Sequence, residues 1–292
     1  MPRPACVINI ADLPLEKRPR FTSTPGVAAL LQTPSASTSL THMGVNVRTI
    51  APGLAGTNRH FHSAEEEWSY VLSGHGVVRL GPHTLPVRAG HFIGFPPGHR
   101  PHHFLCEGAE PLVLLEGGER RPSEDRVWYP DSRLMWRGLK PAEPYEEPPP
   151  EEGDTRQILH VDGVEPTAFQ HSVDPAVRRQ VRTLHLPTGL TRQAVYWARI
   201  ERGNRSTVFH THDRTDEWVF VLSGRAVARV GDDRFDVGPN DFLGHPAGGA
   251  AHVMEAVDEL TYLMGGEVDA DDVITYPEAR LQRVGDQLRP LA

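Results

Sequence analysis

Two short segments of this chain combine histidine and glutamate at a spacing that suits metal binding. HFHSAEEEW begins at residue 60 and HTHDRTDEW at residue 210; each places two histidines two residues apart and a glutamate five residues after the second. Imidazole nitrogens with one carboxylate oxygen suit Fe(II), Mn(II), Ni(II), Co(II) or Zn(II) and disfavour calcium or Cu(I). With a later histidine added to each set, the candidate ligands are His60, His62, Glu67 and His102, and His210, His212, Glu217 and His252.

A β-strand would place both histidines of each HxH pair beside the same ion. Residues two apart in a strand point to the same face, so both members of an HxH pair can turn inward. The glutamate follows far enough along to cross a turn and begin a neighbouring strand. The turns FPPGHRP and HPAGGAA would place the later histidine. A lone HxH pair is more often solvated or packed in a core, but recurrence of the whole set favours ligation, with up to two divalent transition-metal ions per chain.

The recurrence belongs to a longer internal repeat. Residues 60–74 align without gaps on residues 210–224, an offset of 150, and the similarity covers residues 45–134 and 195–281. Near its end, GGER…DRVWYPDSRL resembles GGEV…DVITYPEARL after a small gap. Within each copy, runs such as WSYVLSG and WVFVLSG are rich in aromatic and β-branched residues and end at glycine turns. Many short strands with regular turns predict an all-β fold with an antiparallel barrel or jelly roll in each half and minor helices.

A proline-rich acidic stretch separates the two copies. KPAEPYEEPPPEEGD, residues 140–154, has the composition of an exposed, semi-rigid connector. We therefore expect an N-terminal domain at 1–138, a linker at 139–156 and a C-terminal domain at 157–292. Residues 157–180 could belong to either half.

Composition excludes several classes of protein. The formal net charge is −8 and no run of five or more basic residues occurs, so the electrostatic pattern of a nucleic-acid binder is missing. No run of about 18 apolar residues predicts a membrane span, and no secretory signal is recognisable at residues 1–18. The two cysteines, Cys6 and Cys106, are expected to stay reduced. These features predict a cytoplasmic protein whose partner is a small molecule.

The motifs resemble those of the cupin superfamily. Both copies have an upstream glycine (Gly53, Gly203), then HxH, four residues, Glu, six residues and Gly, and both have a later PxG turn before the last histidine. The sequence departs from the family pattern in the three residues between the PxG glycine and His102 or His252, and in Asn240, which aligns with Gly90. The resemblance implies two tandem cupin β-barrels, a bicupin, and allows a homo-oligomer paired through strand edges.

The resemblance leaves the reaction open. Bicupins with intact sites include dioxygenases and decarboxylases, so a metal-dependent oxidoreductase of the dioxygenase type acting on a small organic molecule is the leading hypothesis. The alternatives are a metal-containing binding or sensing protein without turnover, and a non-redox isomerase or decarboxylase. Function on such a fold must be argued from the site itself.

Residues near the candidate ligands carry further expectations. Glu66 lacks the spacing of Glu217 and is expected to be solvated. His99 is a candidate for contact with the first ligand set, although a loop histidine is more often just exposed. His103 is expected to face away from His102. Cys106 is expected to be a buried, unreactive thiol.

The interiors of the two halves are expected to differ. By strand parity, Asn58 and Ser69 face inward in the first half, where Val208 and Val219 stand in the second. Val71 and Phe104 are likewise matched by Val221 and Met254. The first cavity should therefore be more polar, which favours substrate chemistry there. The residues after the glutamates, Trp68 and Trp218, should point the other way and pack between barrel faces.

Overall fold

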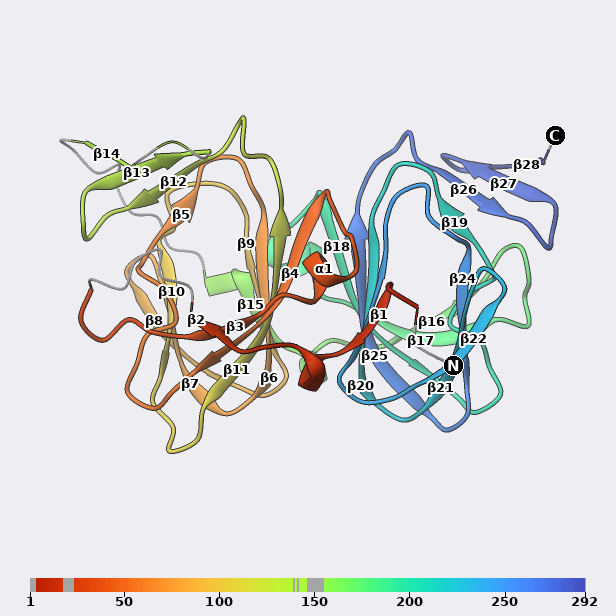
Figure 1. The fold of residues 1–292 in the computed structure, drawn as a ribbon, viewed down its shortest axis with the longest axis horizontal. Coiled ribbons are helices and arrows are strands. Elements are labelled where there is room, and N and C mark those ends of the chain that lie inside the picture. Colours follow the sequence, from red (N-terminus) through yellow and green to blue (C-terminus); the bar gives the residue numbers. More distant parts are fainter. Residues whose placement is uncertain (1–3, 18–23, 139, 141, 146–154, 292) are drawn as a thin grey trace.

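The computed structural model describes residues 4–17, 24–138, 140, 142–145 and 155–291. Two lobes of similar design lie side by side (Figure 1). Each lobe contains a seven-stranded, a three-stranded and a four-stranded sheet, all with antiparallel pairing between the named strands. The all-β prediction is confirmed, since the helices are single turns at Ile10–Asp12, α1 (Pro34–Ser37), Thr155–Gln157, Val161–Gly163 and Leu186–Thr188. No helix in the described ranges is long and apolar enough to cross a bilayer.

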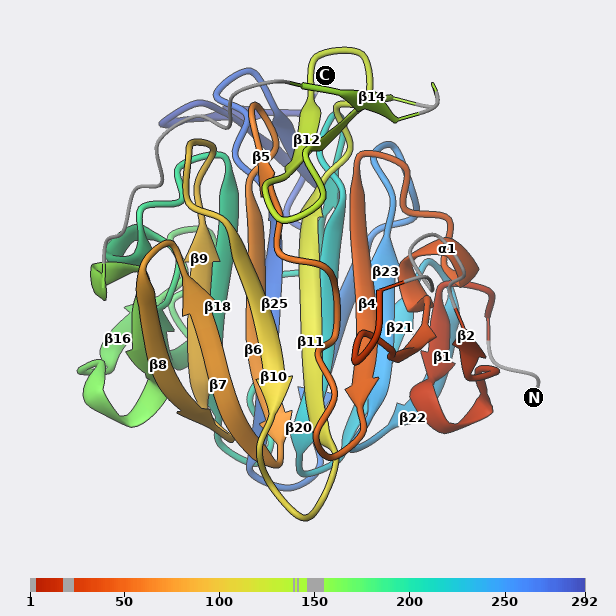
Figure 2. The same cartoon turned by 90° about the vertical axis from the view of Figure 1, so that its left-hand side faces the viewer.

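The N-terminal lobe has its large sheet in the order β15-β9-β6-β11-β4-β3-β2, beside sheets β10-β7-β8 and β14-β13-β12-β5 (Figure 2). The strands are β2 (Glu16–Lys17), β3 (Leu30–Gln32), β4 (Met43–Ile50), β5 (Phe61–His62), β6 (Glu67–Ser73), β7 (His75–Leu80), β8 (His83–Arg88), β9 (His91–Phe95), β10 (His102–Cys106), β11 (Leu112–Glu119), β12 (Arg126–Tyr129), β13 (Leu134–Arg137), β14 (Glu143–Pro144) and β15 (Ile158–His160).

The C-terminal lobe repeats this plan with its large sheet in the order β1-β23-β20-β25-β18-β17-β16, beside sheets β22-β21-β24 and β19-β26-β27-β28. The strands are β1 (Val7–Asn9), β16 (Thr167–Gln170), β17 (Arg178–Thr183), β18 (Gln193–Ile200), β19 (Thr211–His212), β20 (Glu217–Ser223), β21 (Ala226–Val230), β22 (Asp233–Val237), β23 (Asp241–His245), β24 (His252–Ala256), β25 (Leu260–Glu267), β26 (Val273–Tyr276), β27 (Leu281–Val284) and β28 (Gln287–Pro290).

The lobes exchange one edge strand each. β1, from the start of the chain, pairs with β23 of the C-terminal lobe, with Val7 opposite Leu243. β15 pairs with β9 of the N-terminal lobe, with Ile158 opposite Ile93. The segment 157–180, which the sequence left open, is therefore divided, because β16 and β17 join the C-terminal sheet. Most of the expected linker at 139–156 lies outside the described residues.

The two large sheets pack against each other through alternate residues of their central strands. Trp68 of β6 and Trp218 of β20 are almost fully buried and stack at 5.0 Å between ring centroids, which confirms their predicted packing role. A Cβ atom at Gly117 or Gly265 would lie 2.3 or 2.7 Å from the adjacent tryptophan ring, so only glycine fits there. The intervening residues of β6, such as Val71, point into a separate core inside the lobe.

Two buried carboxylates join the lobes reciprocally. Glu66, just before β6, is 1% exposed, so the prediction of a solvated side chain is wrong. Its carboxylate crosses the interface and accepts N–H hydrogen bonds from Thr191, Arg192 and Gln193 at 2.9–3.0 Å. Asp216, the equivalent residue before β20, is fully buried and accepts from the backbone N–H groups of Thr41 and His42, both at 2.8 Å. We call these two carboxylates the interface anchors.

Candidate metal centre

The structure brings the four candidate ligands of the N-terminal lobe together, and we call them the first site. His60 and His102 form an isolated antiparallel bridge, with backbone N···O distances of 3.2 and 2.8 Å. His62 lies on β5, and Glu67 begins β6. The three Nε2 atoms surround Glu67 Oε2, at 3.7 Å from His60, 3.3 Å from His62 and 3.3 Å from His102.

The C-terminal lobe repeats this arrangement in what we call the second site. His210 and His252 form the same bridge, His212 lies on β19, and Glu217 begins β20. The distances from Glu217 Oε2 to the three Nε2 atoms are 3.2 Å for His210, 3.4 Å for His212 and 3.1 Å for His252. In both lobes the HxH pair and the glutamate offer donor atoms within 4.8 Å of one another.

In both HxH pairs the outer nitrogens of the histidines have partners that point the inner nitrogens at the site. His60 Nδ1 lies 2.9 Å from the Asn58 carbonyl oxygen, and His62 Nδ1 lies 2.7 Å from Asp125. His210 Nδ1 is placed in the same way, 2.9 Å from the Val208 carbonyl oxygen. A carbonyl or carboxylate acceptor requires the proton on Nδ1, which leaves Nε2 as the nitrogen that can bind an ion. This donor set fits a divalent transition metal.

Two aspartates that the sequence reading missed support the HxH pairs. Asp125 accepts from His62 Nδ1 and from the backbone N–H of Ala64 at 2.9 Å. Asp272 accepts from His212 Nδ1 at 2.6 Å and from the Arg214 N–H at 2.8 Å. Both are buried. The signal was present in the aligned segments DRVWYPDSRL and DVITYPEARL, since Asp125 and Asp272 are the first residues of these segments.

The electrostatics of both sites favour a cation. Burial opposes ionisation of Glu67 and Glu217, but the surrounding histidines outweigh it and hold the pKa of each carboxyl well below its usual range. Burial would lower the pKa of His62, yet Glu67 and Asp125 raise it to about 9. For His212, Asp272 and Glu217 overcome burial and raise the pKa to about 10. The same negative field that stabilises a proton there would stabilise a metal ion.

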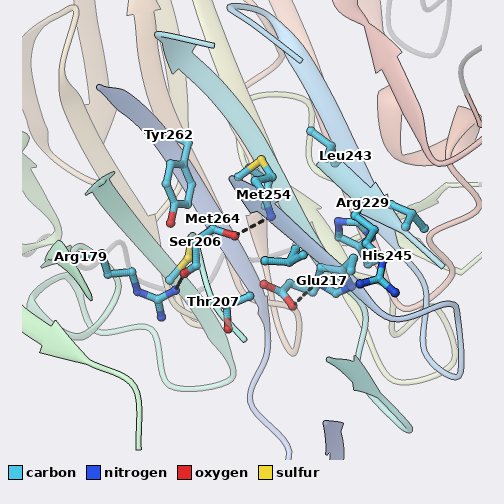
Figure 3. Close-up of a pocket in the computed structure, with 14 residues that line it drawn as sticks. Arg179, Ser206, Thr207, Glu217, Arg229, Leu243, His245, Met254, Tyr262 and Met264 are labelled. Carbon is cyan, nitrogen blue, oxygen red and sulfur yellow. Dashed lines mark hydrogen bonds and ion pairs between the residues drawn. The ribbon is translucent and has the colours of Figure 1, made fainter. Parts of the chain in front are cut away.

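The surroundings of the two sites differ in size and polarity. A cavity of about 420 Å³, which we call the inner cavity, adjoins the first site. Its polar lining includes Asn46, Arg48, Ser69, Glu116 and Arg120. The cavity that adjoins the second site measures about 20 Å³, room for about one water molecule. Leu243, Met254, Tyr262 and Met264 line this cavity together with Arg179, Ser206 and Thr207 (Figure 3). The first cavity is the more polar one, as predicted, but the second is not apolar apart from its ligands, since Arg179, Ser206 and Thr207 line it.

The ring that stacks on the last histidine also differs. Phe95 stacks on His102 at 3.8 Å between centroids, and His245 stacks on His252 at 3.5 Å. Burial and the neighbouring His252 hold the pKa of His245 well below its usual range. A buried, neutral imidazole can fill the space of a phenyl ring, so His245 is a packing residue.

The other residues singled out from the sequence do not join the ligand set of the first site. His99 packs against Phe61 at 5.5 Å between ring centroids. His103 Nδ1 lies 3.2 Å from the Thr57 carbonyl oxygen, yet His103 also borders the inner cavity and does not simply face away. Cys106 is a buried free thiol, as predicted, and donates to the Glu110 carbonyl oxygen at 3.3 Å.

Comparison with known proteins identifies the repeat. The cupin domain family matches residues 46–117 and again residues 196–265. No curated protein matches the chain in sequence.

Solved structures share the fold over both lobes. Oxalate decarboxylase from Lactobacillus farciminis, in a formate complex, is 14% identical with a TM-score of 0.61, over 91% of this chain and 87% of that one. Protein YlbA from E. coli is 14% identical with a TM-score of 0.60, over 90% of each chain. Salicylate 1,2-dioxygenase from Pseudoaminobacter salicylatoxidans is 12% identical with a TM-score of 0.58, over 77% of this chain and 69% of that one. At these identities the similarity concerns the fold alone.

Proposed function

Because this chain belongs to the cupin family and carries two cupin domains, we propose that it is a metal-dependent enzyme whose reaction takes place at the first site. The observation that carries this proposal is the difference between the two cavities. About 420 Å³ beside the first site accommodates a small organic molecule, whereas about 20 Å³ beside the second does not. The second site would hold its ion for structural reasons.

The ligands would be His60, His62, Glu67 and His102 at the first site and His210, His212, Glu217 and His252 at the second. An ion at the first site would supply Lewis acidity and, for a redox metal, one-electron chemistry. The chain itself would orient the substrate through Asn46, Arg48 and Ser69, which line the inner cavity. Asp125 would hold His62 in the orientation and tautomer that ligation needs.

We propose an oxidoreductase of the dioxygenase type, acting on a small organic molecule. The fold is compatible with this, since a salicylate 1,2-dioxygenase shares it. It is equally compatible with a decarboxylation that consumes no oxygen, since oxalate decarboxylase shares the fold as well. Oxygen consumption therefore separates the two reactions.

The test begins with elemental analysis of untagged protein purified without chelator. We expect about two transition-metal ions per chain. Oxygen uptake is then measured with the metal found, against catechols, diketones and hydroxy acids, and should disappear in His62→Ala. Product formation without oxygen uptake would indicate a non-redox isomerase or decarboxylase, and bound metal without any turnover would indicate a binding or sensing protein. No stoichiometric metal, even after anaerobic reloading, would reject the proposal.

A further inference from the structure

A second, larger cavity adjoins the inner cavity of the N-terminal lobe. This outer cavity measures about 590 Å³, and three residues, Arg48, Thr57 and His60, line both cavities. Apolar side chains such as Val27, Leu30 and Leu54 form much of its wall, and Lys17 also borders it. An apolar compartment thus meets a polar one at Arg48, directly beside a ligand of the first site.

The Arg48 guanidinium still has hydrogen-bonding capacity at this junction. Nε donates to Glu116 at 2.7 Å and Nη1 donates to the Gly56 carbonyl oxygen at 3.1 Å. Within the described part of the chain, Nη2 has no acceptor. Because an arginine carries five N–H donors in one plane, the Nη edge can bind a carboxylate while Nε keeps its ion pair with Glu116.

The second site lacks these polar groups at the same places in the sheet. In the N-terminal lobe Arg48 stands opposite Leu114 and Glu116 opposite Asn46 on strands β4 and β11. In the C-terminal lobe the matching pairs on β18 and β25 are Ala198 with Tyr262 and Met264 with Tyr196. The Arg48–Glu116 ion pair is therefore specific to the lobe with room for a substrate, and the equivalent sheet of the other lobe forms without it.

We propose that the substrate of the first site is an organic carboxylate with an apolar body. This inference rests on the proposed function and adds the substrate class to it. The carboxylate would bind the Nη edge of Arg48 at the junction of the cavities, and the apolar body would occupy the outer cavity. Lys17 adds a positive charge along the same cavity, and Glu116 holds the guanidinium in place without occupying its Nη edge.

The test compares two probes of the same shape, hexanoate and hexanamide, by equilibrium calorimetry on the metal-loaded protein. The wild type should bind hexanoate more tightly. Arg48→Met should weaken hexanoate binding by about 10- to 100-fold, the usual worth of a charged hydrogen bond, and should weaken hexanamide binding much less, because an amide oxygen accepts a weaker hydrogen bond than a carboxylate. Glu116→Gln should strengthen hexanoate binding by roughly threefold to tenfold, because a competing negative charge is removed.

The opposite signs of the two variants separate recognition from structural support. If Arg48 and Glu116 only stabilised the wall, both substitutions would weaken both probes. Arg225→Met, which breaks an exposed pair with Asp258 in the other lobe, is the matched control and should change nothing. Equal binding of the two probes to the wild type, or equal weakening by both variants, would overturn the inference.

Binding needs no turnover, so this result is independent of the proposed reaction. Unchanged hexanoate binding in Arg48→Met, in a protein that still turns over substrate, would reject only the substrate class. If the wild type showed no turnover but still bound hexanoate more tightly than hexanamide, only the proposed reaction would be rejected. If Arg48→Met does not fold, Arg48→Lys is the substitute variant for the binding test. It keeps the positive charge and should retain most of the selectivity for hexanoate.

Discussion

The first and second sites use the same side chains at equivalent positions, yet about 420 Å³ of free volume adjoins the first and about 20 Å³ the second. Strand bridges, tautomer-fixing acceptors and interface anchors recur in both lobes. What differs is the lining: Ser69, Arg48 and Glu116 of the N-terminal lobe are replaced by Val219, Ala198 and Met264 at the equivalent positions of the C-terminal lobe. The frame that would hold an ion and the surface that would select a substrate are thus separable features of one fold.

Loss of one histidine from each site should give the largest contrast. We expect His62→Ala to lose one ion per chain and all turnover, and His212→Ala to lose one ion per chain and keep most turnover, because no substrate reaches the second site. Elemental analysis and steady-state kinetics measure the two outcomes. Equal loss of activity in both variants would show that the sites act together and would remove the distinction drawn here.

The interface anchors should matter equally in both lobes. Glu66→Ala and Asp216→Ala each leave at least two part-buried backbone N–H groups without their acceptor, at about 1 kcal/mol each. We therefore expect each to destabilise the protein by about 2 kcal/mol, measured as a shift in urea unfolding. Glu107→Ala, at an exposed carboxylate of the N-terminal lobe, is the control and should shift it little. A small effect in only one lobe would show that the anchoring is not reciprocal.

The supporting aspartates should influence metal retention to a similar degree at both sites. Removing the group that orients a ligating histidine typically weakens metal binding by about 10- to 100-fold. We expect this loss at the first site in Asp125→Ala and at the second in Asp272→Ala, measured by competition with a chelator of known affinity. Asp125→Asn, which keeps an acceptor oxygen, should lose less. Unchanged retention in Asp125→Ala would mean that the backbone alone orients His62.

Exchange of the stacked rings should have the smallest effect. Because His245 packs on His252 as Phe95 packs on His102, His245→Phe is close to volume-conserving and should cost less than about 1.5 kcal/mol. The metal content of the second site should not change. If His245→Phe released the ion, His245 would be a ligand, and the second site would differ from the first in its frame as well.

The sequence predicted the strands and all eight candidate ligands because these depend on local spacing within a repeat. It did not predict the role of Glu66, because a carboxylate beside a ligand looks solvated until the other lobe is in place. A clue was available, since an acidic residue stands before the ligating glutamate in both copies, Glu66 and Asp216. Asp125 and Asp272 were missed for a related reason: they act about 60 residues from the histidines that they support.

Local sequence patterns could not predict which sheets β1 and β15 join. Each is a three-residue strand whose partner is set by the packing of whole lobes. Short strands at a sheet edge have little hydrophobic periodicity of their own, so no window of sequence specifies the sheet that they join.

The exchange of β1 has a consequence for synthesis of the chain. Asn9 is hydrogen-bonded to Asp241, 232 residues further on, so the early strand leaves the ribosome long before the edge that it completes. During translation β1 stays unpaired until β23 has been synthesised, and only then can the edge of the C-terminal sheet form. Each large sheet takes an edge strand from the other half of the chain, so separate expression of either half would leave a bare edge on its large sheet.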